Sequence, residues 1–129
     1  MVFSADGSRV ASVSTYGTVA LWDPSSFRLI AAFRGHAQGA HGVTFSPDGR
    51  RLATGGGTGR DAVKLWDLST YRELITLPGK GSLFSHVLFS PDGRWLAAIC
   101  GTEGTFDLWR APSWAEIEAE EKEQGGQSP

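Results

Sequence analysis

Short stretches in which apolar and polar positions alternate follow one another along residues 2–110, and turn-forming residues separate them. In the middle part of the chain these stretches cover residues 42–46, 50–56, 62–67 and 71–77. Each is rich in β-branched, aromatic or leucine side chains and is bounded by Gly, Pro, Asp or Ser, which is typical of β-strands. The pattern therefore predicts a unit of four short antiparallel strands.

The same unit occurs three times. The phrase FSPDGR stands at residues 45–50 and 89–94, and FSADGS stands at residues 3–8. Each phrase is followed by an apolar run and then by Leu-Trp, and Trp22, Trp66 and Trp109 are 44 and 43 residues apart. Self-similarity at this period indicates a repeat architecture. Within the phrase, proline pre-sets the turn, aspartate caps it and glycine accepts the exit geometry, so each copy predicts a tight corner.

The third unit differs in its fourth segment, where the sequence reads AEIEAE and Glu118 and Glu120 occupy positions that are apolar in the first unit. Ser113 and Glu116 form a capping-box pattern directly after Pro112, which favours a short helix with Trp114 and Ile117 as its apolar contacts. The expected organisation is unit 1 at 1–42, unit 2 at 43–86, an incomplete unit 3 at 87–112, a helix at 113–123 and a disordered tail at 124–129.

Units of 42–44 residues that carry SPDG and LWD resemble the WD-repeat family of β-propellers, over residues 2 to about 110. The resemblance implies an all-β fold of four-stranded antiparallel blades arranged around a central channel, with three strands in the third blade. The chain resembles the carboxyl-terminal part of a larger, bacterial-type member. For function, the resemblance implies a non-catalytic scaffold for association between proteins, and the alternative is the carboxyl-terminal propeller of a larger signalling enzyme such as a kinase or protease.

The resemblance also implies a hydrogen-bonded structural tetrad of His, Ser or Thr, Asp and Trp within a blade. The candidate members are His36, Thr54, Asp61 and Trp66 in the second unit, Ser12 and Trp22 in the first, and Trp109 in the third. The first unit has Tyr16 at the aspartate position, and the third has Ala98 at the hydroxyl position. His36 is interpreted as structural rather than catalytic, because no companion residues for a ligand site accompany it.

Loops between second and third strands, and those just before first strands, are where a propeller binds its partners. The candidates in these loops are Tyr16, His41, Arg60, Phe84, His86 and Glu103. An ordinary solvated loop is the alternative interpretation for each of them. No metal or cofactor is expected, because His41 and His86 lack the spacing of metal ligands and no third ligand accompanies them.

Composition excludes several other classes of protein. Hydrophobic residues make up 40% and charged residues 20% of the chain, and the net charge of −2 argues against nucleic-acid binding. The chain has no apolar run of the roughly 20 residues that span a membrane, and no signal peptide is visible. The single cysteine, Cys100, rules out an internal disulfide and suits a reducing compartment, so we expect a cytoplasmic protein. Its thiol is expected to be buried.

The sequence gives no support to an enzyme. A GxSxG motif is missing, and GGGTGR at residues 55–60 lacks the Lys-Ser/Thr ending of a phosphate-binding loop. A hydrolase with its site in the central channel is the third and least favoured class.

Three blades do not close a ring, because propellers contain 4–8 blades, and an open arc exposes two apolar blade faces. We therefore expect the chain to be a fragment, a self-assembling piece, or both. The expected assembly is a homo-oligomeric ring, as a six-bladed dimer in preference to a nine-bladed trimer, with the helix at Trp114 near each junction.

Overall fold

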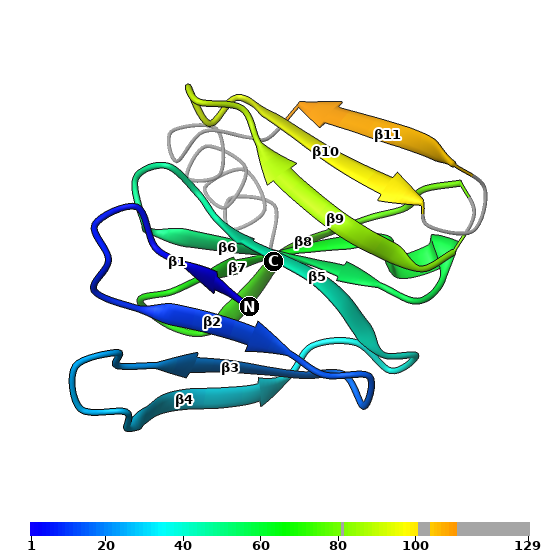
Figure 1. Cartoon of the computed structure of the whole chain (residues 1–129). Helices are drawn as coiled ribbons and strands as arrows, with labels where there is room; N and C mark the ends of the chain where they lie inside the picture. The colour runs from blue at the N-terminus through cyan, green and yellow to red at the C-terminus, as the bar shows by residue number, and fades with distance from the viewer. Residues whose placement is uncertain (81, 101–103, 111–129) are drawn as a thin grey trace, which may run out of the picture.

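A computed structural model describes residues 1–80, 82–100 and 104–110 of the chain, and in these ranges three antiparallel sheets are stacked side by side (Figure 1). We call the sheets blade 1, blade 2 and blade 3 in chain order. Blade 1 contains β1 (Val2–Phe3), β2 (Val10–Val13), β3 (Thr18–Trp22) and β4 (Leu29–Arg34). Blade 2 contains β5 (Ala40–Phe45), β6 (Arg51–Gly56), β7 (Val63–Asp67) and β8 (Arg72–Leu77). Blade 3 contains β9 (Phe84–Phe89), β10 (Trp95–Cys100) and β11 (Thr105–Arg110).

Within each blade, neighbours in sequence are also neighbours in the sheet. The all-β fold class and the sheets of four, four and three strands confirm what the hydrophobic pattern predicts for the described residues. The expected helix at 113–123 and tail at 124–129 lie outside those residues. Blade 2 begins at Ala40 and blade 3 at Phe84, slightly before the expected unit boundaries at 43 and 87. The segment after β6 contains a short 3₁₀ helix, η1 (Gly59–Asp61).

The FSPDGR corners join the first and second strands of the blades through side-chain hydrogen bonds. In blade 2 the Ser46 hydroxyl donates to Asp48 Oδ1 at 2.5 Å, and the same carboxylate oxygen accepts the Arg50 amide at 3.0 Å. The Arg51 amide donates to Ser46 Oγ at 3.0 Å. Gly49 has φ of +72°, a conformation that side chains disfavour. Blades 1 and 3 repeat this arrangement at Ser4 and Ser90.

Two hydrophobic cores hold the blades together, because successive side chains of a strand point to opposite faces of its sheet. The core between blades 1 and 2 contains Ala11, Val19, Leu21, Phe45, Leu52, Trp66 and Leu68. The core between blades 2 and 3 contains Ala53, Ala62, Val63, Leu65, Phe84, Val87, Leu96, Ala98 and Cys100. Blade 2 is therefore covered on both faces by other described residues, whereas blades 1 and 3 are each covered by a neighbouring blade on one face. Burial of these apolar side chains is the main force that aligns the blades.

Candidate protein-interaction surface

The segment between β4 and β5 carries His36 into the junction of blades 1 and 2. The Gly35 and His36 amides both donate to the Gly17 carbonyl, at 2.7 and 3.3 Å, which fixes this segment against the β2–β3 loop. A Cβ atom at Gly35 would lie 2.8 Å from Val19 Cγ2 and 3.4 Å from the Trp66 ring. The close approach therefore requires glycine directly before the histidine.

The imidazole of His36 links β6 to η1 of blade 2 in a chain of hydrogen bonds. Its Nε2 lies 2.7 Å from Thr54 Oγ1, and its Nδ1 lies 3.1 Å from Asp61 Oδ2. The Trp66 indole donates to Thr54 Oγ1 at 3.0 Å. Thr58 completes the chain by donating to Asp61 Oδ1 at 2.6 Å. The four candidate members in the second unit are thus brought together, and Asp61 provides the carboxylate.

The indole and the carboxylate at the two ends fix which atom donates in each hydrogen bond of this chain. An indole nitrogen only donates and a carboxylate only accepts. His36 Nδ1 therefore carries the proton that Asp61 accepts, and Nε2 accepts the hydroxyl proton of Thr54. Burial lowers the pKa of His36 below its ordinary 6.5, and the hydrogen bond to Asp61 opposes this shift only in part. His36 is consequently neutral at pH 7, which is the state that this chain of bonds requires.

A hydroxyl, an imidazole and a carboxylate in this order have the geometry of a nucleophile, a base and an orienting acid. Thr54 is fully buried, however, and its oxygen already accepts the hydrogen bond of Trp66. A substrate therefore has no access to this hydroxyl, and the arrangement acts as a structural link between strands.

The other two blades have partial versions of this link. In blade 1 the Trp22 indole donates to Ser12 Oγ at 3.0 Å, at an exposed position. In blade 3 the alanine at position 98 offers no acceptor, and the Trp109 indole donates to the Pro78 carbonyl at 3.1 Å instead. The Lys80 amide nearby donates to Asp107 Oδ2 at 3.0 Å. Sequence reasoning missed Pro78 and Asp107, because neither stands at a position of the tetrad pattern.

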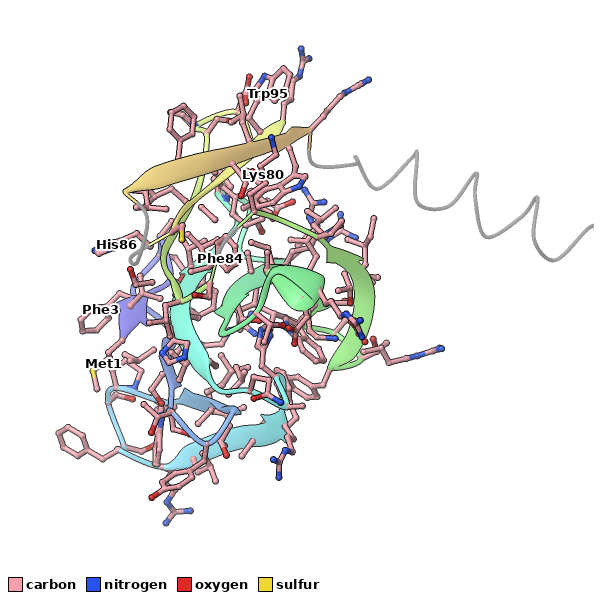
Figure 2. All side chains as sticks on the ribbon, turned by 90° about the vertical axis from the view of Figure 1, so that its right-hand side faces the viewer. Met1, Phe3, Lys80, Phe84, His86 and Trp95 are labelled. Atoms are coloured by element: carbon pink, nitrogen blue, oxygen red, sulfur yellow. The ribbon has the colours of Figure 1, made fainter. Side chains whose placement is uncertain are left out.

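Two of the candidate partner-binding residues lie together. His41 is in β5 and His86 is in β9, so the prediction that they lie in loops is wrong. Both line a groove of about 250 Å³ on the side formed by the first strands of the blades. Met1, Val13, Ser85 and Leu88 also line this groove. Figure 2 shows Met1, Phe3 and His86 along one side of the molecule. The groove therefore presents both apolar side chains and imidazole and hydroxyl groups that can form hydrogen bonds.

The remaining candidates are placed differently. Tyr16, in the β2–β3 loop, and Arg60, in η1, are exposed, but neither lines this groove. Glu103 lies outside the described residues.

The prediction for Phe84 is wrong. It is the first residue of β9 rather than part of a loop, its side chain is 0% exposed, and it belongs to the core between blades 2 and 3. Figure 2 shows Phe84 in the interior, while His86 lies at the margin. A Cβ atom at Gly79 would lie 3.1 Å from the ring of Phe84, so the segment before β9 covers it closely. Phe84 therefore stabilises the junction and offers nothing to a partner.

Among residues 1–80, 82–100 and 104–110, no group of three or more His, Cys, Asp or Glu side chains could hold a metal ion. Within these ranges no helix has the length and apolar character needed to cross a membrane. Cys100 is buried, as the sequence predicts, with its thiol 2.9 Å from the Ser82 carbonyl.

Comparisons with known proteins identify the class. The sequence profile of the WD domain, G-beta repeat (WD40), matches residues 27–67 and 71–110, which is more than half of the chain. The chain therefore belongs to the WD40 family. The structure resembles a chain of the crystal structure of the mitotic checkpoint complex with a TM-score of 0.74, over 85% of this chain and 34% of that chain. At 22% identity this likeness shows the propeller fold alone.

A more similar sequence is the protein groucho of Drosophila melanogaster. It is 39% identical over 56 residues, which is 43% of this chain and 8% of groucho. The chain thus spans less than a tenth of that relative.

The two WD40 repeats matched by the family profile are offset from the blades. Residues 27–67 contain β4 to β7, and residues 71–110 contain β8 to β11. Each sequence repeat therefore includes the last strand of one blade and the first three strands of the next, so that it connects two blades.

Proposed function

We propose that this protein is a non-catalytic, cytoplasmic WD40 scaffold that binds other proteins. The observation that carries the proposal is the groove between the first strands, where His41 and His86 meet apolar side chains from β1, β2 and β9. A concave surface of this kind, with a few polar groups among apolar ones, suits a short peptide segment of a partner. Each imidazole can donate or accept a hydrogen bond with the peptide backbone.

Affinity recovery with paired variants tests this proposal. The immobilised full chain is incubated with an extract of the source cells, and the proteins retained are identified by mass spectrometry. We expect wild type and the control Thr70→Ala, which alters an exposed residue of the β7–β8 turn, to retain the same protein. The double variant His41→Ala/His86→Ala should lose most of it. Equal recovery by the double variant would contradict binding in this groove.

Tyr16 and Arg60 provide a second arm of the experiment. Both are exposed, and neither lines the groove. A partner that contacts the segments between second and third strands, rather than the first strands, would be lost from Tyr16→Ala/Arg60→Ala. The histidine double variant would keep it. Turnover of generic ester, phosphate or peptide substrates by rigorously purified protein would contradict the non-catalytic part of the proposal.

The proposal includes association of the chain with itself to complete a ring. Its support is the number of blades: the described residues form three, and a propeller closes with 4–8. Two copies give six blades, and we favour this dimer over a trimer with nine blades. Light scattering on the purified chain decides between a mass near 13.8 kDa and about two or three times that value.

A second candidate is that these blades form the carboxyl-terminal propeller of a larger signalling enzyme, such as a kinase or a protease. In its favour, the chain corresponds to only 8% of groucho and 34% of the checkpoint-complex chain. The genomic sequence upstream of residue 1 tests it. A kinase or protease domain in the same reading frame would support this candidate, and a stop codon in that frame would contradict it.

A further inference from the structure

The two internal junctions are built from equivalent positions. Each blade presents one face through an alanine of its second strand and two apolar residues of its third strand, and we call this its leucine face. The leucine faces consist of Ala11, Val19 and Leu21 in blade 1 and of Ala53, Val63 and Leu65 in blade 2. Because the strands alternate, the opposite face of each blade carries the tryptophan.

We call that opposite face the tryptophan face. It consists of Phe45, Leu52 and Trp66 in blade 2 and of Phe89, Leu96 and Trp109 in blade 3. At both junctions the leucine face of one blade packs against the tryptophan face of the next blade. The chain therefore uses one type of interface twice.

One face of each type is left open by the described residues. The leucine face of blade 3 consists of Ala97, Phe106 and Leu108, as the pairing of β10 with β11 shows. The tryptophan face of blade 1 consists of Phe3, Val10 and Trp22. Phe106 is 68% exposed, Leu108 56%, Phe3 63% and Trp22 38%, whereas Val10 is 8% exposed. Apolar exposure on this scale is typical of surfaces that associate.

We propose that the leucine face of blade 3 packs against the tryptophan face of blade 1 in a second copy of the chain. The reverse contact between the same two copies forms the second junction, and the six blades close into a ring. This inference rests on the self-association part of the proposed function and names its surfaces. The interface continues the two internal junctions, since it joins the same types of face in the same order.

The open faces also differ from the internal ones in a complementary way. Position 106 is phenylalanine where the covered leucine faces have Val19 and Val63, so this face is bulkier. Position 10 is valine where the covered tryptophan faces have Leu52 and Leu96, so that face is smaller. The first change adds volume to one open face and the second removes volume from the other.

A fourth position supports the same pairing. Across the junction of blades 2 and 3, the Arg51 guanidinium carbon lies 5.8 Å from the centre of the Phe89 ring. The equivalent positions of the open faces are Trp95 in blade 3 and Phe3 in blade 1. Both side chains are substantially exposed, and Figure 2 shows Trp95 and Phe3 as labelled sticks at the surface. In the ring an aromatic pair would replace the cation–π contact.

Light scattering at micromolar concentration tests the interface with matched variants. We expect wild type at about twice 13.8 kDa. Phe106→Asp/Leu108→Asp places two charges on the open leucine face and should give a monomer with an unchanged circular dichroism spectrum, because both side chains are exposed in a single copy. The control Phe27→Asp removes an 85% exposed phenylalanine from the β3–β4 turn, outside both faces, and should remain a dimer. A monomeric wild type, a trimeric mass, or a dimeric double variant would overturn the proposal.

Disulfide trapping tests which faces meet. The variants Leu108→Cys and Phe3→Cys, both at exposed positions, are purified separately, and the native Cys100 stays buried in both. We expect a disulfide-linked dimer only when the two variants are mixed, because the ring places position 108 of one copy against the blade 1 face of the other. Dimers formed by Leu108→Cys alone, or no link in the mixture, would overturn this pairing. Neither result would affect the test of the His41 groove, so failure of the interface and failure of partner binding are distinguishable.

Discussion

Blades 1 and 2 contain the same pair of side chains in two environments. In both, a tryptophan at the end of the third strand donates its indole hydrogen to a hydroxyl of the second strand at 3.0 Å. In blade 2 the tryptophan is 6% exposed, the hydroxyl of Thr54 is buried, and His36 extends the pair to Asp61. In blade 1 Trp22 is 38% exposed and Ser12 is half-buried. The difference comes from blade 1 itself, because its leucine face and the segment that follows it cover the pair in blade 2.

We therefore expect the same hydrogen bond to contribute differently to the free energy of unfolding in the two blades. A hydrogen bond between buried groups is expensive to break, because the groups left behind have no water to bind. An exposed bond of the same length is readily exchanged for water. The covering blade, rather than the bond, sets the contribution to stability.

The largest expected effect is that of Thr54→Val in blade 2. The substitution leaves the Trp66 indole and His36 Nε2 without their partner in a buried position. We expect the free energy of unfolding to fall by about 2–4 kcal/mol, the cost of two unsatisfied buried groups. Urea denaturation followed by tryptophan fluorescence measures it. Thr54→Ser is the control, since it keeps the hydroxyl and removes only the methyl group. A loss as large as that of Thr54→Val would contradict a dominant contribution from these hydrogen bonds.

The next largest effect concerns a feature that does not depend on the covering blade. Gly49 and Gly7 have φ of +72° and +73°, and a Cβ atom at either would meet nothing within 4 Å. Valine is disfavoured by this backbone conformation alone, so we expect Gly49→Val and Gly7→Val to cost about 1–3 kcal/mol each. Asparagine tolerates positive φ, so Gly49→Asn should retain most of the thermal stability. Unchanged thermal midpoints for both valine variants would contradict the assigned corner geometry.

A smaller effect is expected for Ser12→Ala in blade 1. Because Trp22 is partly exposed, its indole can bind water when the hydroxyl is removed. The expected loss is about 0.5 kcal/mol, near the lower end for a single hydrogen bond. The same urea measurement applies, under conditions in which the chain is monomeric. A loss equal to that of Thr54→Val would remove the proposed difference between the blades.

The smallest expected effect is the pH dependence that arises from His36. Its pKa is lowered in the folded state, so the unfolded chain takes up a proton first as the pH falls below about 6.5. Stability from this group is therefore complete above that pH and decreases towards the folded-state pKa. The Asp6 carboxyl does not interfere, since the Ser8 amide and the hydroxyls of Ser8 and Ser4 lower its pKa to about 2.

Thermal midpoints between pH 8 and pH 5.5 measure this dependence. We expect a lower midpoint at pH 5.5 for wild type and a smaller change for His36→Asn, which cannot titrate in this window. Equal pH dependence in the two proteins would show that other groups cause it.

The sequence by itself determined the repeat, the strands and the corners. Each depends on residues close together in the chain: alternation marks strands such as β6 and β7, and Pro47 and Gly49 fix the turn before β6. The tetrad positions in blade 2 could also be predicted, because Gly35-His36, Thr54 and Trp66 match the motif of the family that the sequence resembles. Local sequence was sufficient wherever the cause was local.

Only the tertiary structure decided which of these positions are buried and what they contact. Phe84 was expected in the loop just before a first strand, but pairing with Cys100 starts β9 there, and the ring lies in the core. Trp109 takes the Pro78 carbonyl because blade 3 offers no hydroxyl at position 98. The groove of His41 and His86 likewise exists only because β5 and β9 lie side by side (Figure 1). Burial and contact depend on residues far apart in the chain, which a local pattern does not contain.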